Sequence, residues 1–244
     1  MPASRKFRAR IIARNDRVKP GSEYRQMPDF ESLRQTMVDT QLRTNKVTDD
    51  RILAAMGEIP RENFTPDDRS ALAYIDEDIP ISAGRCMVEP MILARMIQTT
   101  EIDADDVVLD VASGSGYSAA VLSRIARAVV AVESDSDLVR KSSEQMMELG
   151  MDNVVVEQGP IEYGWPDQAP YDVIIVNGAC SDVPDTLFEQ LAEGGRLCAV
   201  TVGESGVGSA RLWTKRNGHV SNRPLFDANI PGLPELQREA GFSF

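Results

Sequence analysis

The segment 107–116, V-V-L-D-V-A-S-G-S-G, constrains the fold more than any other part of this chain. Its first half is a short apolar run, typical of a strand buried on both faces of a parallel sheet. Small residues with two glycines follow, and they allow a tight turn and a close approach of the backbone to a ligand. Residues 117–125 then have the pattern of a helix. This order predicts the first βα unit of a parallel α/β sheet.

An acidic residue lies at the end of this strand and of the next one. Asp110 belongs to the first strand, and Glu133 follows the apolar run 128–132. The turn also fits the loose glycine fingerprint of dinucleotide-binding proteins. However, Asp110 would repel a diphosphate and attract the α-ammonium group of a methionine moiety. The pattern therefore favours S-adenosylmethionine over NAD.

Glu133 is placed where a carboxylate accepts hydrogen bonds from both hydroxyls of a ribose, which either cofactor would offer. The alternative is that both acids cap helices in a sheet that binds no ligand. The candidate cofactor-binding residues lie after four successive predicted strands. They are Asp110, Ala112, Ser113, Gly114, Ser115, Gly116, Glu133, Ser134, Gly159, Pro160 and Asn177.

The rest of the chain alternates between helices and strands. Helices are expected at 29–44, 49–57, 91–97 (opened by Pro90), 136–149 and 185–192, and strands at 153–157, 171–176 and 196–202. A hairpin is then expected from 210–216 and 219–226, joined by Asn217-Gly218, a strong hairpin signal. These elements predict a doubly wound, mostly parallel, Rossmann-like sheet of the class I methyltransferase type, with N-terminal helices and a C-terminal antiparallel hairpin. That ending differs from the second half of an NAD-dependent dehydrogenase.

Composition and charge favour one acidic domain. The chain has 244 residues, of which 42% are hydrophobic, enough for one sizeable core. Its net charge is −12. Residues 1–26 carry eight basic and two acidic residues, a net +6, which leaves −18 for the remainder. We expect 1–26 to be a disordered basic extension, or an arm for an anionic partner, and 27–244 to be a single domain. The acidic domain disfavours nucleic acid as substrate.

The cysteines and the hydropathy pattern bear on location. Cys86, Cys180 and Cys198 are widely spaced, and His219 is the single histidine, so neither a zinc site nor a disulfide framework is expected. This usage fits a reducing cytoplasm. No apolar run approaches membrane-spanning length, and no cleavable signal pattern is present, so we expect no membrane association. The oligomeric state has no signature in the sequence.

Over residues 37–233 the chain resembles the protein-L-isoaspartate O-methyltransferases. The similar segments are the block M-V-D-T-Q-L-R-T-N-K-V-T-D-D-R-I-L-A-A-M-G-E-I-P-R-E-N-F, the loop S-G-S-G-Y-S-A-A-V-L, and the later Y-D-V-I and L-A-E-G-G-R-L. The resemblance implies methyl transfer from S-adenosylmethionine to the free carboxylate of an L-isoaspartyl (or D-aspartyl) residue in a protein or peptide, which begins repair. Such a carboxylate is ionised at neutral pH, so its attack on the methyl group requires no general base.

The chain departs from the family pattern where the acceptor should bind. The family usually has P-I-G-x-G-Q-T-I-S-Q-P, whereas residues 80–90 here are P-I-S-A-G-R-C-M-V-E-P. Cys86 and Val88 replace the Thr and Ser whose hydroxyls line the acceptor pocket, and Ser82 is a candidate to restore one hydroxyl. Arg85 replaces a glutamine. Its guanidinium would either hold a substrate carboxylate or pair with Glu89, four residues on. The acceptor-site candidates are thus Ser82, Arg85, Cys86 and Val88.

Two cofactor-side positions also depart from the family. Ala112 stands in place of the first loop glycine, which is tolerable if its φ is negative. Gly159-Pro160-Ile161 replaces Gly-Asp-Gly and removes the acid expected near the adenine, for which Glu162 is a candidate substitute. Three hypotheses remain: an isoaspartyl carboxyl methyltransferase, a relative that methylates a different acceptor, and a non-catalytic S-adenosylmethionine-binding module.

Overall fold

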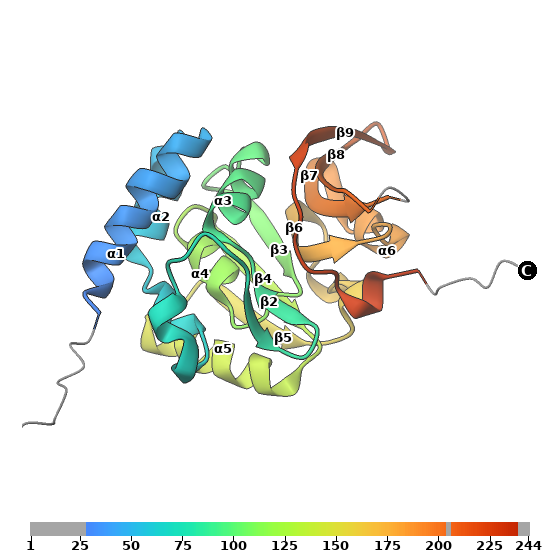
Figure 1. Ribbon diagram of the computed structural model, residues 1–244. Coiled ribbons are helices and arrows are strands. Elements are labelled where there is room, and N and C mark those ends of the chain that lie inside the picture. Colours follow the sequence, from blue (N-terminus) through green and yellow to red (C-terminus); the bar gives the residue numbers. More distant parts are fainter. Residues whose placement is uncertain (1–27, 204–205, 239–244) are drawn as a thin grey trace, which may run out of the picture.

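The computed structural model describes residues 28–203 and 206–238 (Figure 1). The predicted basic extension, 1–26, lies outside the described residues. A seven-stranded sheet has the order β5-β4-β3-β6-β7-β8-β9, and a separate two-stranded hairpin pairs β1 with β2. Helices flank the sheet, and the N-terminal pair α1 and α2 lies farthest from the C-terminal strands (Figure 1).

The elements have the following bounds. The helices are α1 (Phe30–Met37), α2 (Asp50–Glu58), α3 (Pro90–Thr99), α4 (Tyr117–Ser123), α5 (Ser136–Glu148) and α6 (Asp185–Glu189). The strands are β1 (Ile79–Ser82), β2 (Arg85–Met87), β3 (Val107–Val111), β4 (Ala128–Glu133), β5 (Val154–Gln158), β6 (Tyr171–Cys180), β7 (Leu191–Val202), β8 (Gly208–Arg216) and β9 (His219–Asp227). Short helical turns are η1 (Val38–Leu42), η2 (Arg43–Asn45), η3 (Arg61–Phe64), η4 (Asp67–Leu72), η5 (Ile161–Tyr163), η6 (Pro166–Gln168) and η7 (Pro234–Leu236). No helix in the described part of the chain is long and apolar enough to cross a membrane.

The sheet confirms the predicted doubly wound architecture. Strands β5, β4, β3, β6 and β7 run parallel to one another, and β8 and β9 continue the sheet in antiparallel pairing. In β3, Val108 packs with the layer of helices α1 to α5, whereas Leu109 and Val111 pack on the opposite face with Leu187 of α6. Because successive side chains point to opposite faces, burial on both sides explains the nearly continuous apolar run.

Several boundaries differ from those predicted. The first helix, expected over 29–44, is α-helical only to Met37 and then continues as the π turn η1 and the 3₁₀ turn η2. The helix expected over 185–192 ends at Glu189, because Leu191 already pairs with Tyr171 at the start of β7. The C-terminal hairpin lies where it was predicted. The hairpin of β1 and β2 was not predicted.

After β9 the chain returns to the carboxyl end of the sheet. We call residues 231–236 the C-terminal strap. Its backbone follows the end of β6: the Ala179 N–H donates to the Pro231 carbonyl (2.9 Å), and the Leu233 N–H donates to the Ala179 carbonyl (2.8 Å). Figure 1 shows this segment, in red, running from β9 past β6. The strap also packs on the turn of the β1–β2 hairpin, since a Cβ at Gly84 would lie 2.8 Å from Cγ of Pro234.

Candidate functional site

Asp110 is the buried acid at the end of β3. It has no exposed surface, and its two oxygens accept hydrogen bonds from the Ser118 hydroxyl (2.6 Å) and the Asn177 side-chain amide (2.8 Å). Burial raises the pKa of Asp110 to about 7, although these two hydrogen bonds act in the opposite direction. A cation placed beside this carboxyl would favour its charged form. Asp110 and Asn177 therefore form a polar cluster at the carboxyl edge of the sheet.

Glu133 is the corresponding acid at the end of β4, and it is also fully buried. Three backbone N–H groups donate to its carboxylate, those of Gly114 (3.0 Å), Ser134 (2.7 Å) and Asp135 (3.1 Å). The Nε of Arg85 lies 3.0 Å from both carboxylate oxygens. Since a carboxylate offers about four acceptor positions, these donors occupy all of them.

Arg85 connects Glu133 to the C-terminal strap. Its Nη2 donates to Glu235 (2.7 Å) and to the Ser134 hydroxyl (2.8 Å), and its Nη1 donates to Glu235 (3.1 Å) and to the Gly84 carbonyl (3.1 Å). The Arg85 side chain is 4% exposed. Burial acts to lower the pKa of Arg85, but the carboxylates of Glu235 and Glu133 outweigh burial and raise it. The guanidinium in turn lowers the pKa of Glu235.

The predicted alternative, an ion pair between Arg85 and Glu89, is wrong. Residues four apart meet on a helix, but Arg85–Met87 is a strand, in which four residues span about 13 Å. Glu89 instead lies near other acids. Burial, together with the charges of Asp78, Asp76 and Glu77, raises the pKa of Glu89 to about 7.

Cys86 and Val88 line a small cavity at the end of β3. The cavity volume is about 10 Å³, roughly the room of one water molecule. Burial raises the pKa of the Cys86 thiol to about 12, so the thiol is neutral near pH 7. The hydroxyls of Ser113 and Tyr117 are buried with no hydrogen-bond partner among the described residues. The full lining is Ile81, Cys86, Met87, Val88, Leu93, Ser113, Ser115, Tyr117, Ser118 and Asn177.

Other predicted residues take different positions. The Ser82 hydroxyl donates to Asp135 (2.8 Å) and is not among the residues that line the cavity. Ala112 has a φ of +54°, so the condition under which its methyl group would be tolerated, a negative φ, is not met: the backbone keeps the left-handed conformation that suits a glycine. Gly159 packs beside Trp165 and donates its N–H to the Glu133 carbonyl (3.0 Å). Pro160 precedes η5, where one carboxylate oxygen of Glu162 is buried without a partner among the described residues.

Sequence reasoning missed three residues around the site. Ser118 donates to Asp110, and its place in the first turn of the helix after the loop was a usable signal. Arg61, also fully buried, donates to the Val88 carbonyl (2.8 Å), and its guanidinium lies 4.6 Å from the Tyr117 ring centre. These contacts fix the backbone of the acceptor loop. Glu235 gave no signal, because 150 positions separate it from Arg85.

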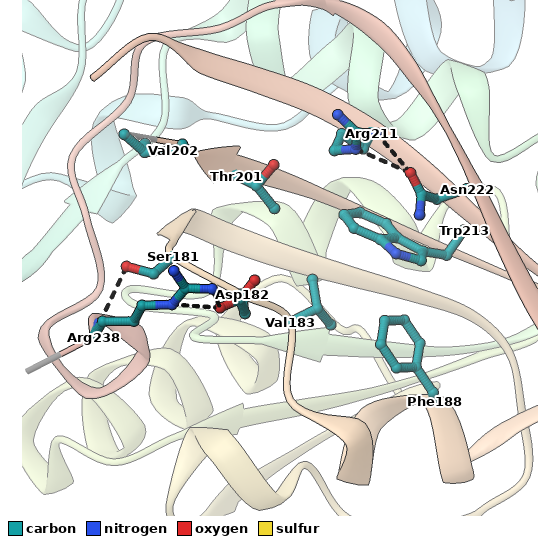
Figure 2. Close-up of a pocket in the computed structure, with 11 residues that line it drawn as sticks. Ser181, Asp182, Val183, Phe188, Thr201, Val202, Arg211, Trp213, Asn222 and Arg238 are labelled. Atoms are coloured by element: carbon teal, nitrogen blue, oxygen red, sulfur yellow. Dashed lines mark hydrogen bonds and ion pairs between the residues drawn. The ribbon is translucent and has the colours of Figure 1, made fainter. Parts of the chain in front are cut away.

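A much larger cavity, about 610 Å³, lies between the segment that follows β6 and the strands β7, β8 and β9 (Figure 2). Trp213 and Phe188 form part of its wall, with ring centres 6.0 Å apart. Figure 2 shows Arg238 paired with Asp182 at its border, at 2.8 Å. None of the predicted site residues lines this cavity.

The residues at these positions determine whether S-adenosylmethionine, the cofactor that the sequence favours, can bind. The polar cluster at Asp110 and the unpartnered Ser113 hydroxyl match a polar ligand. However, Glu133 has no acceptor position left, and the cavity is far smaller than the roughly 300 Å³ or more of small-molecule sites. A Cβ at Gly114 would lie 2.7 Å from Cδ1 of Ile81, so Ile81 fills the space over the loop. The residues therefore do not fit S-adenosylmethionine in this conformation.

Comparisons with known proteins agree with the fold. The family model described as protein-L-isoaspartate(D-aspartate) O-methyltransferase matches residues 32–228. A protein-L-isoaspartate O-methyltransferase 2 from Anaeromyxobacter sp. is 42% identical over 182 residues, which cover 75% of this chain and 74% of that protein. A protein-L-isoaspartate O-methyltransferase from Synechococcus sp. is 43% identical over 176 residues, 72% of each chain.

Solved structures give the same result. A protein-L-isoaspartate O-methyltransferase structure aligns with a TM-score of 0.73 and 28% identity, covering 84% of this chain and 67% of that chain. A second structure, of a putative protein-L-isoaspartate O-methyltransferase from Plasmodium falciparum in complex with S-adenosyl-L-homocysteine, shares the fold with a TM-score of 0.69 and 24% identity, covering 83% of this chain and 98% of that one. The chain therefore belongs to the protein-L-isoaspartate(D-aspartate) O-methyltransferase family, a family of S-adenosylmethionine-dependent O-methyltransferases.

Proposed function

We propose that this chain transfers a methyl group from S-adenosylmethionine to the carboxylate of L-isoaspartyl (or D-aspartyl) residues in proteins or peptides, a reaction of protein repair. The match of the family model over residues 32–228 carries the proposal. The buried cluster of Asp110, Ser118 and Asn177 supports it, because it puts polar groups at the carboxyl edge of the sheet, where ligands of open α/β sheets bind.

The proposed roles follow from the positions of the residues. Asp110 and Asn177 would hold the methionine part of the cofactor. Glu133, with Ser134, would hold the ribose once Arg85 has released the Glu133 carboxylate. Cys86 and Val88 would line the acceptor side. The acceptor carboxylate is already ionised at neutral pH, so alignment is the main requirement, and the neutral Cys86 thiol need not act as a base. Cys86, Cys180 and Cys198 are free thiols, which supports a cytoplasmic location.

A second candidate is methylation of a different acceptor. The two hydroxyls that the family usually presents are absent, and Ser82 does not replace them, because its hydroxyl is bound to Asp135. Val88 is 3% exposed and offers only apolar side-chain contact. An acceptor that docks here would rely on shape more than on hydroxyl hydrogen bonds.

Methyl transfer from labelled S-adenosylmethionine tests both candidates. An isoaspartyl peptide and its normal aspartyl twin are incubated with the protein at saturating cofactor, and base-labile label is counted. We expect label on the isoaspartyl peptide alone. Label on neither peptide, with cofactor binding demonstrated in the same preparation, would rule out the isoaspartyl acceptor and favour the second candidate.

A further inference from the structure

We use the term cofactor cleft for the carboxyl edge of the sheet around Asp110, Glu133 and the loop 113–116. We propose that Arg85 keeps this cleft closed by binding Glu133 and Glu235 at once, and that the cofactor binds only when Arg85 withdraws. This inference rests on the proposed function, since it takes S-adenosylmethionine as the ligand. It makes Arg85 a residue that sets cofactor affinity instead of the substrate clamp that the sequence suggested.

A ribose and Arg85 compete for one carboxylate, that of Glu133. Glu133 lies at the end of the second strand of the parallel unit, where an acid binds the ribose hydroxyls of nucleoside cofactors. Its oxygens already accept three backbone N–H groups and the Nε of Arg85. The backbone donors are fixed by the loop and by the end of β4. Arg85 and the Ser134 hydroxyl, which lies 3.3 Å from one carboxylate oxygen, are the two donors that can leave. Of these, only Arg85 contacts both carboxylate oxygens, so ribose and Arg85 exclude each other.

Arg85 joins three segments that are distant in sequence: the β1–β2 hairpin, the end of β4 and the C-terminal strap. The hairpin carries Ile81, which fills the space over Gly114. The strap carries Leu233, which packs over Gly178, since a Cβ there would lie 2.6 Å from Cγ of Leu233. While the ion pairs hold, Ile81 stays over the glycine loop and Leu233 stays packed on the end of β6.

The closed state is reversible. Glu133 keeps three backbone hydrogen bonds when Arg85 leaves, so it is not left as an unsatisfied buried charge. The Glu235 side chain is 33% exposed and borders solvent. A ribose would then replace the donor that Glu133 lost. Apparent affinity equals intrinsic affinity multiplied by the open fraction, so removal of Arg85 should tighten binding.

Titration calorimetry with S-adenosylhomocysteine, which cannot transfer a methyl group, tests the proposal. We expect Arg85→Gln to bind at least tenfold more tightly than the wild type. Glu235→Ala frees the strap but leaves Arg85 on Glu133, so its affinity should lie between the two. Asp182→Ala is the matched control: it removes the Arg238–Asp182 pair, which also involves the C-terminal segment but lies outside the cleft, and affinity should not change.

The outcomes are distinct. If the wild type binds as tightly as folded Arg85→Gln, the closure proposal is overturned and the proposed function stands. If no folded variant binds S-adenosylhomocysteine, both are overturned. If Arg85→Gln does not fold, the comparison of Glu235→Ala with the wild type decides, and equal affinities overturn the closure. If Arg85 only stabilised the fold, its removal would weaken the binding of S-adenosylhomocysteine. That change is the opposite of the one expected here.

Discussion

Asp110 and Glu133 hold equivalent positions on neighbouring strands, yet their surroundings differ in charge. Asp110 has neutral donors, the Ser118 hydroxyl and the Asn177 amide, and these do not offset burial, so its pKa rises to about 7. Glu133 has the guanidinium of Arg85. The two acids could be predicted from the ends of apolar runs. The pairing of Arg85 could not, because its carboxylate partners lie 48 and 150 positions away.

The raised pKa of Asp110 predicts a pH-dependent gain in stability for Asp110→Asn. Between the unfolded pKa of about 3.9 and the folded value of about 7, the folded state holds a proton that the unfolded state releases. Wild-type stability therefore falls as pH rises through this window, and asparagine removes that loss. The Ser118 hydroxyl can rotate and accept from the new amide. We expect the Tm difference between Asp110→Asn and the wild type to become more positive by a few degrees between pH 5 and pH 8.

Differential scanning fluorimetry at the two pH values measures this gain. Asp137→Asn, at an exposed acid in the first turn of α5, is the control and should show no such change. A Tm difference for Asp110→Asn that is the same at both pH values would contradict the raised pKa.

At the scale of elements, the hairpin and the strap stabilise each other through Gly84. Its φ is +74°, and a Cβ there would lie 2.8 Å from Cγ of Pro234. Gly218 has nearly the same φ, +73°, but nothing lies within 4 Å of a Cβ. Gly218→Ala therefore measures backbone strain alone. Gly84→Ala adds the collision with the strap, and we expect it to cost about 1 kcal/mol more in urea unfolding. Equal losses for the two variants would show that hairpin and strap do not depend on each other.

The same elements show where sequence prediction succeeds and where it fails. Strands β3, β4 and β6 were predictable, because a strand buried on both faces must be apolar along its length. The Asn217-Gly218 turn specified the final hairpin by local chemistry. Strands β1 and β2 are four and three residues long and lie outside the main sheet, so no periodicity marks them. The strap is held by hydrogen bonds to β6, a tertiary contact without a local signature.

At the scale of the whole molecule, the net charge of −12 bears on which form of the cofactor binds. S-adenosylmethionine carries one net positive charge at neutral pH, whereas S-adenosylhomocysteine is neutral overall. The cleft adds negative charge of its own when Arg85 is absent, because Glu133 and Glu235 then lose their shared cation. An acidic protein with such a cleft attracts the cationic cofactor through long-range electrostatics.

This attraction predicts a difference in salt dependence for Arg85→Gln. Added salt shortens the Debye length from about 10 Å at 0.1 M to about 3 Å at 1 M and screens the long-range attraction. We expect the affinity for S-adenosylmethionine to fall several-fold over this range, while that for S-adenosylhomocysteine stays nearly constant. Calorimetric titrations of both ligands at the two salt concentrations, without an acceptor, make the comparison. Equal losses for the two ligands would mean that short-range contacts in the cleft, and not the charge of the molecule, govern binding.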